Sequence, residues 1–170
     1  MSLLPVLRRL RADQSGLAAV EFSLWSVLFF LVALSGMDFA QFYFQRSAAD
    51  EAVSAAAVSA FSTRTNVNFT DMQPYVRALA GDTGLTVTTS CNGTSGSCTN
   101  LNRTCSCLKS NGTYVAAACG STCTGSGVTT GSTAGYYLTI SATRPYQPMI
   151  LPAGMVMPTR VAQKATVRLQ

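Results

Sequence analysis

The sequence predicts an α+β protein, in which one long amino-terminal transmembrane and assembly helix packs on a small, disulfide-bonded antiparallel β-sheet domain. Three observations lead to this prediction. An apolar run of membrane length, Leu17 to Gly36, continues into an alanine-rich segment without glycine or proline up to Phe61. Beyond Gly84 the apolar residues recur with a period of two, as in a strand. All six cysteines lie in one 33-residue window of this second part.

The first sixteen residues form a short, basic segment that carries Arg8, Arg9 and Arg11. It shows no pattern that would build a core, and basic segments in front of an apolar run are typical of targeting sequences. We therefore divide the chain into a cleaved leader (1–16), a long helix (17–61) and an extracytoplasmic domain (62–170) with a short helix and an antiparallel sheet.

The segment 17–36 has the length and composition of a membrane-spanning helix. Eleven of its twenty residues are Leu, Val or Phe, and twenty helical residues rise about 30 Å, the thickness of the hydrocarbon core. On an insertion scale these eleven residues contribute about −3 to −6 kcal/mol, whereas one central charge costs about +3 kcal/mol. Glu21 lies near the end of the run, where its cost is smaller, so the segment should insert despite this acid.

Two simpler interpretations of the apolar segment stay open. It could be an ordinary secretory signal peptide, because Ala33-Leu34-Ser35 resembles a small-x-small cleavage site. However, the apolar part of a signal peptide is usually shorter, about 7–15 residues, and gains nothing from a glutamate. It could also be an uncleaved membrane anchor. The first residue of the mature protein separates the three cases, because it would be Leu17, Gly36 or Met1 respectively.

The distribution of arginines predicts the orientation in the membrane. Three arginines precede the span, whereas the twenty residues after it carry only Arg46. Because basic residues stay on the cytoplasmic side, the amino end should face the cytoplasm and the rest of the chain should lie outside. The clustered, even-numbered cysteines agree with this orientation, since disulfides form in oxidising compartments.

Nothing stops the long helix between Met37 and Phe61, where alanine, the strongest helix former, is frequent. A helix over 17–61 would be about 68 Å long, so its outer half must pack on its own domain, on neighbouring subunits or on both. Asp38 is expected to be a solvated residue at the membrane surface, with a second assembly contact as the alternative. The packing face should follow a 3-4 spacing, with Arg46 as one basic interruption, through Phe39, Phe42, Arg46, Ala49, Val53, Ala56 and Ala60.

The remainder of the chain predicts a second, short helix and several strands. The helix covers 71–80, with Thr70 as its N-cap and Gly81 past its end. Its inward residues should be Met72, Val76 and Leu79. Strands are predicted at 85–91, 113–118, 136–146 and 159–169, and a proline-rich loop joins the last two. An antiparallel sheet of such strands can bury one face on the long helix.

The cysteines are expected to form three structural disulfides, each stabilising the fold by roughly 2–4 kcal/mol. Six cysteines allow fifteen pairings. Cys105 and Cys107 lie two apart on an extended segment and point the same way, so each should pair with a more distant cysteine. We expect a Cys91–Cys98 bridge, with Cys105 and Cys107 joined to Cys119 and Cys123 in either order.

Composition argues against several functional classes. The chain has no histidine, which removes the commonest general base and metal ligand. The net charge of +5 is partly carried by the leader and is otherwise too diffuse for a nucleic-acid interface. We therefore expect no enzymatic activity, no cofactor, no metal, no small-molecule substrate and no nucleic acid.

The leader ending in Gly16 and followed by Leu-Ala-Ala-Val-Glu21-Phe22 resembles class III type IV prepilins. Other segments resemble the TadE-like minor pilins, or pseudopilins, of the Tad (Flp) pilus. They are residues 36–43, the alanine-rich helix, the tail 146–168, and the cysteines at 105, 107, 119 and 123 before a Tyr-rich strand. Cys91 and Cys98 look like an addition to the usual pattern.

The resemblance implies a pilin-like fold, cleavage by a prepilin peptidase between Gly16 and Leu17, and a role in assembling an adhesive pilus. The implied partners are a TadF-like subunit, the major Flp pilin and the bacterial inner membrane, with later residence in the periplasm or a cell-surface pilus. Glu21 and Phe22 would act in assembly, Glu21 by pairing with the new amino group of its own or a neighbouring subunit. The alternative is a membrane-anchored extracytoplasmic binding module that does not polymerise.

Overall fold

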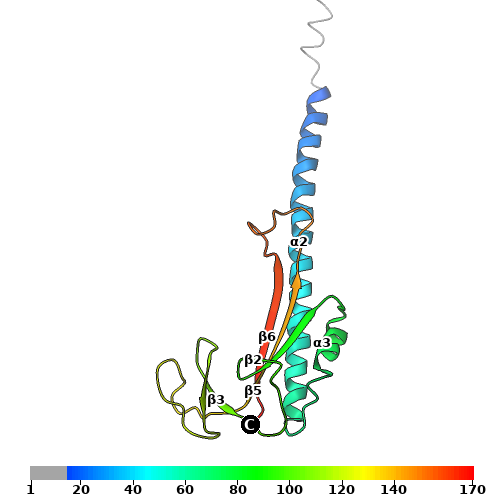
Figure 1. The fold of residues 1–170 in the computed structure, drawn as a ribbon. Coiled ribbons are helices and arrows are strands. Elements are labelled where there is room, and N and C mark those ends of the chain that lie inside the picture. The colour runs from blue at the N-terminus through cyan, green and yellow to red at the C-terminus, as the bar shows by residue number, and fades with distance from the viewer. Residues whose placement is uncertain (1–14) are drawn as a thin grey trace, which may run out of the picture.

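The computed structural model describes residues 15–170, so most of the predicted leader lies outside the described residues. Helix α2 runs from Ser15 to Ser62 and contains 48 residues. Its amino-terminal half projects alone, and its carboxyl-terminal half lies against a small β domain (Figure 1). The α+β class and the helix predicted over 17–61 are therefore confirmed.

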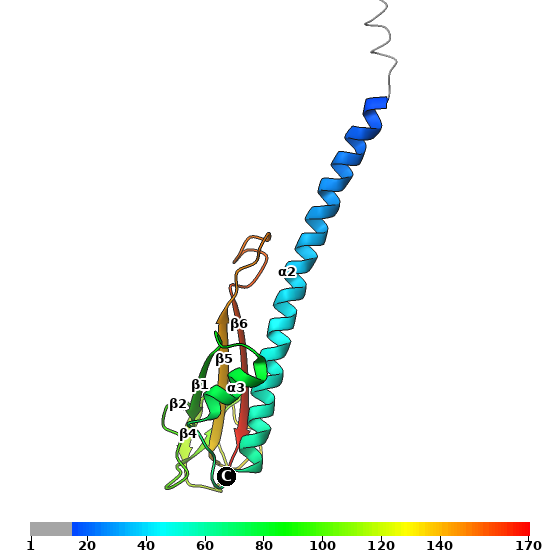
Figure 2. The ribbon, with the colours of Figure 1, turned by 90° about the vertical axis from the view of Figure 1, so that its right-hand side faces the viewer.

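Four strands form the main antiparallel sheet, in the order β2-β1-β5-β6. These strands are β1 (Thr86–Cys91), β2 (Thr94–Ser95), β5 (Tyr137–Pro145) and β6 (Arg160–Arg168). Strands β5 and β6 pair along their whole length, with Ile140 opposite Ala165. The sheet lies along the lower part of α2 (Figure 2). The strands predicted at 85–91, 136–146 and 159–169 are confirmed within one residue at each end.

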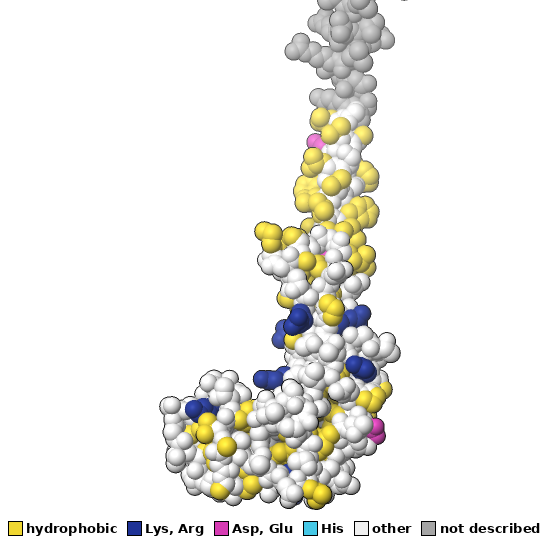
Figure 3. Space-filling model, in the orientation of Figure 1, with side chains coloured by type: hydrophobic (Ala, Val, Ile, Leu, Met, Phe, Trp, Pro, Cys, Tyr) yellow, Lys and Arg dark blue, Asp and Glu magenta, His cyan; other side chains and the backbone are white. Residues whose placement is uncertain are grey.

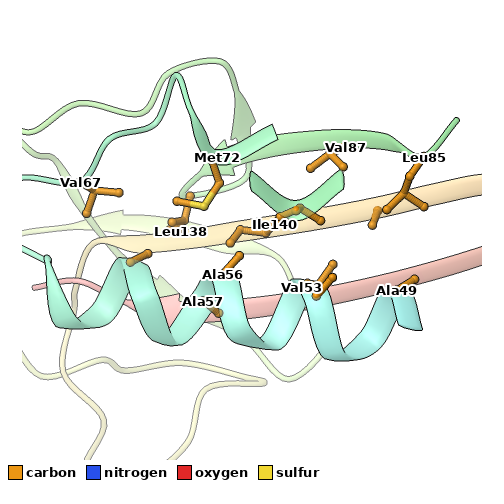
Figure 4. Close-up of a cluster of buried hydrophobic side chains, with 14 of the residues drawn as sticks. Ala49, Val53, Ala56, Ala57, Val67, Met72, Leu85, Val87, Leu138 and Ile140 are labelled. Carbon is orange, nitrogen blue, oxygen red and sulfur yellow. The ribbon is translucent and has the colours of Figure 1, made fainter. Parts of the chain in front are cut away.

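The core forms where the alanine-rich half of α2 meets the inner face of this sheet. In Figure 4, Ala49, Val53 and Ala56 of the helix face Leu138 and Ile140 of β5. All five side chains are buried. Because alanine side chains are small, the strands can approach the helix closely, and the longer side chains of β5 fill the space between them. The alanine face of the helix is therefore buried against the sheet of its own domain.

The predicted helix face is wrong at one position. Phe39 is half exposed although the neighbouring Asp38 is buried, whereas Arg46 is exposed, as a basic interruption of the face would be. Ala52 and Ala57 are buried in addition to the predicted residues. A broad sheet therefore covers a wider stripe of the helix than a single 3-4 row.

Helix α3 (Met72–Ala80) covers one edge of the core. It ends as predicted at Gly81, whose φ of +62° is the left-handed conformation that glycine adopts readily. The predicted N-cap is wrong, since Asp71 occupies that position and exchanges hydrogen bonds with Asn68. The inward position of Leu79 is also wrong, because Ala80 packs on the core instead and leaves Leu79 half exposed.

A second, two-stranded sheet pairs β3 (Cys105–Leu108) with β4 (Tyr114–Ala117). The strand predicted at 113–118 exists but belongs to this separate sheet. Disulfides join Cys105 to Cys119 and Cys107 to Cys123 around it, and the predicted Cys91–Cys98 bridge joins the end of β1 to the loop after β2. The small cluster around β3 and β4 has few apolar side chains, so cross-links replace much of the stabilisation that a core would give.

Candidate functional site

The amino end of α2 presents the residues of the predicted processing and assembly site. Gly16, Leu17, Glu21 and Phe22 are all exposed and follow one another in a continuous helix. Leu17 and Glu21 are four residues apart, so their side chains lie one turn apart on the same helix face. A cut between Gly16 and Leu17 would leave a new α-amino group close to the Glu21 carboxylate.

Glu21 has no basic partner among residues 15–170, where the one ion pair joins Arg144 to Asp82. Ionisable side chains within membrane segments usually pair with another charge, because an unpaired charge is costly in hydrocarbon. Within the described residues, the Glu21 carboxylate is therefore an exposed acid without a cationic neighbour.

The apolar half of α2 has the properties of a membrane anchor. The described residues contain one helix, Gly16–Ser62, that is long and apolar enough to cross a membrane, and none of its most apolar window is buried in the protein. The hydroxyls of Ser23, Ser26 and Ser35 each donate to a carbonyl oxygen three or four residues earlier, at 2.7–2.8 Å. Because these hydroxyls are already hydrogen-bonded, they need no water in the surroundings of the helix.

Asp38 lies two residues beyond the apolar segment 17–36 and connects α2 to the loop between β5 and β6. Its side chain is 1% exposed. Oδ1 accepts a hydrogen bond from the N–H of Met149 at 2.8 Å. Oδ2 accepts from the N–H groups of Ile150 at 2.9 Å and Leu151 at 3.0 Å. Three donors compensate the buried carboxylate without a cation.

Tyr146, directly after β5, adds contacts to this junction between α2 and the β5–β6 loop. Its hydroxyl donates to the main-chain carbonyl oxygen of Asp38 at 2.7 Å. Its ring packs edge-on against Phe42, with 5.2 Å between the ring centroids, and its N–H donates to the carbonyl oxygen of Thr159 at 2.8 Å. Both ends of the loop are thus fixed near the helix.

Hydrogen bonding sets the charge state of this junction. The backbone N–H groups of Leu151 and Met149, together with that of Ile150, lower the pKa of the Asp38 carboxyl, although burial acts in the opposite direction. Burial raises the pKa of the Tyr146 hydroxyl, and the negative charge of Asp38 adds to this effect. At neutral pH, Asp38 is therefore ionised and Tyr146 keeps its proton.

The prediction of a solvated Asp38 is wrong. The three N–H donors lie 111 to 113 residues further along the chain, so local sequence gives no sign of them. A role for the Asp38 carboxylate in contacting another subunit would require the displacement of these bonds.

The structure does not bring all predicted site residues together. Glu21 and Asp38 belong to the same helix but are separated by about 25 Å along its axis. The six cysteines lie in the β domain and are all bridged, so their role is structural. Within residues 15–170 there is no cluster of three or more His, Cys, Asp or Glu side chains that could hold a metal ion.

Comparison with protein families finds that residues 16–58 match the model of the family described as TadE-like protein. The matched residues comprise the apolar segment and most of the remaining helix, and they end before the β domain begins. A search among curated proteins and among solved structures finds no match.

Proposed function

Because residues 16–58 are TadE-like and so associate the chain with the Tad pilus system, we propose that it is a minor pilin, or pseudopilin, of that system. The chain enters the inner membrane with its amino end in the cytoplasm, and a prepilin peptidase cleaves it after Gly16. It then takes part in the assembly of an adhesive Tad (Flp) pilus and catalyses no reaction itself.

The observation that carries the proposal is the bare apolar half of α2, with Glu21 near its start. Most of its side chains are exposed, and most of the segment projects beyond the β domain (Figure 1). A helix that is apolar all round needs apolar surroundings. The bilayer supplies them before assembly, and the apolar helices of neighbouring subunits supply them afterwards.

The proposed role of Glu21 follows from cleavage. Hydrolysis of the Gly16–Leu17 bond creates an α-amino group that is cationic near neutral pH. Glu21 of the same chain, or of an incoming subunit, attracts this group inside the apolar bundle. The pair sets the axial register of the helices, because any other register would leave a charge unpaired in hydrocarbon.

The β domain is the part that remains outside the membrane in this proposal. Its three disulfides fit an oxidising compartment. The surfaces that it leaves exposed are available to a TadF-like subunit and to the major Flp pilin.

The amino terminus of the mature protein provides the first test. Sequencing of the membrane-extracted chain is expected to begin at Leu17, and a Gly16→Leu variant should retain its leader, because the peptidase needs a small residue before the cut. A mature chain that begins at Gly36 would indicate a signal peptide. A chain that retains Met1 in cells with an active peptidase would favour the alternative, an anchored binding module.

A second test concerns assembly after cleavage. Glu21→Gln keeps the shape of the side chain and removes its charge, and Glu51→Gln is the matched control on an exposed face of the same helix. We expect the Glu21 variant to be cleaved but to be lost from purified pili and from complexes with other pilins. The Glu51 variant should behave as the wild type, and normal assembly of both variants would refute the role of the charge.

A further inference from the structure

The loop between β5 and β6 exposes apolar side chains although its backbone is firmly held. Met149, Ile150, Met155 and Val156 are between 46% and 87% exposed. Isolated exposed apolar residues are ordinary, but several gathered on one projecting loop usually mark a contact surface. We call these four residues the loop tip.

The loop tip is held by contacts at three points. The N–H groups of Met149 and Ile150 are bonded to Asp38, and Tyr146 joins the start of the loop to the same residue. Met157 is buried in the main core, and its carbonyl oxygen accepts a hydrogen bond from the N–H of Gly154 at 2.8 Å. The fold therefore fixes the backbone while it leaves the apolar side chains uncovered.

The position of the loop indicates what covers it. The loop is the part of the β domain that reaches furthest toward the amino end of α2 (Figures 1 and 2). It is bonded to α2 at Asp38, two residues after the apolar segment 17–36 ends. In Figure 3, apolar side chains on the loop lie beside the apolar part of the helix. A bilayer that surrounds the segment 17–36 therefore reaches the loop tip.

The basic residues next to the loop also fit contact with a membrane surface. Arg160 begins β6 directly after the loop, and Arg46 lies about two turns beyond Asp38 on α2; both side chains are exposed. Arginines at this depth can place their guanidinium groups among lipid phosphates while their stems lie along apolar surface.

We propose that the loop tip inserts into the outer interface of the membrane that α2 spans, as a second point of attachment. The ligand is the lipid bilayer itself, with the apolar side chains of the loop tip among the upper acyl chains and Arg46 and Arg160 at the headgroups. The two attachments fix the angle of the β domain against the membrane before assembly, and withdrawal from the bilayer must free the loop tip as well as the helix. This inference rests on the membrane insertion of α2 but not on cleavage or polymerisation.

Tryptophan fluorescence in the full-length chain, reconstituted into vesicles of phosphatidylethanolamine and phosphatidylglycerol, tests the proposal. Trp25 is the single tryptophan and lies in the apolar segment, so it reports on the anchor. In a Trp25→Phe background, Met155→Trp places the probe on the loop tip. Leu101→Trp is the control, because Leu101 is 78% exposed, against 87% for Met155, but follows Asn100, which is bonded to Val67 beyond the far end of α2.

Lipids brominated near the headgroup should quench the tryptophan at 155 and shift its emission to shorter wavelengths, and they should leave the tryptophan at 101 unchanged. Equal emission from the two probes, with Trp25 of the wild type quenched by deeply brominated lipid, would overturn the proposal and leave the anchor intact. An emission shift at 155 that depends on protein concentration and not on brominated lipid would overturn it in favour of a second copy. An unquenched Trp25 would overturn both the anchor and the loop contact.

Discussion

The hydroxyl of Tyr146 donates a hydrogen bond to the main-chain carbonyl oxygen of Asp38, 108 residues earlier in the sequence, at 2.7 Å. The bond joins the end of β5 to α2 just beyond the apolar segment. The side chain of Asp38 extends the same junction to the following loop through three further bonds. The β domain is therefore attached to the helix just beyond the apolar segment as well as along the alanine face.

Replacement of Asp38 by Asn should destabilise the β domain. The amide keeps the size of the carboxylate but places an NH₂ group against backbone N–H donors, so at least one donor loses its acceptor. Asp50→Asn is the matched control, because Asp50 is exposed on the same helix. Thermal unfolding in detergent should show a lower midpoint for the Asp38 variant alone, and equal midpoints for the two variants would contradict this role.

The contribution of Asp38 should depend on pH. Its pKa is lowered from the ordinary value of 3.8 by the backbone N–H groups of Leu151, Met149 and Ile150. The carboxylate therefore stabilises the folded state at pH values above that ordinary value, and the contribution is lost as the pH falls through the lowered pKa. The difference in unfolding midpoint between wild type and Asp38→Asn should be constant from pH 7 to pH 5 and should shrink toward pH 2. A difference that does not change with pH would exclude this charge effect.

Replacement of Tyr146 by Phe should cost about 1 kcal/mol of the free energy of unfolding, because it removes one buried hydrogen bond and keeps the contact with Phe42. Tyr43→Phe should change the stability by less than about 0.5 kcal/mol, since Tyr43 is 69% exposed on the same helix. Chemical denaturation of both variants measures the difference. A neutral Tyr146 variant would show that the ring alone holds the junction.

The alanine face should not tolerate larger side chains. Ala56 is fully buried between α2 and the sheet, so Ala56→Leu should force the two apart and cost about 1–3 kcal/mol. Val58→Leu adds bulk at a 69% exposed position of the same helix and should be nearly neutral. Denaturation curves that coincide for the two variants would mean that the helix and the sheet are loosely packed.

The disulfide connectivity can be tested with single variants. Cys105→Ala should leave Cys119 as the free thiol, and Cys107→Ala should leave Cys123. Alkylation of the oxidised protein followed by peptide mass spectrometry identifies the labelled residue. Each variant should also lose about 2–4 kcal/mol of stability. Labels at the opposite positions would show the crossed pairing.

Much of the fold follows from local patterns in the sequence. The long helix follows from composition and from the absence of glycine and proline between Met37 and Phe61. Strand β5 follows from the alternation of Leu138, Ile140 and Ala142, since a period of two leaves one side for the core. Such signals are local, so one chain segment is enough to detect them.

The features that sequence reasoning missed depend on contacts between distant segments. The environment of Asp38 is set by N–H groups more than 100 residues away. The strand at Tyr114–Ala117 was identified by its residues, but among the described residues it pairs with β3 in a separate sheet, and two disulfides join β3 to the segment after β4. In α3, Ala80 and not the predicted Leu79 faces the core, and this orientation of the helix depends on the shape of the core beneath it.

In the proposed membrane-inserted protein, the attachment at Asp38 would make helix and sheet one rigid arm that begins near the bilayer surface. About 36 Å of helix lies beyond Asp38, and the sheet runs beside it to the far end. A helix tilt of about 20° within the bilayer would therefore swing that end sideways by roughly 12 Å. Small changes in membrane thickness or in the packing of neighbouring helices would in this way produce a large displacement of the disulfide-linked β3–β4 sheet at the far end.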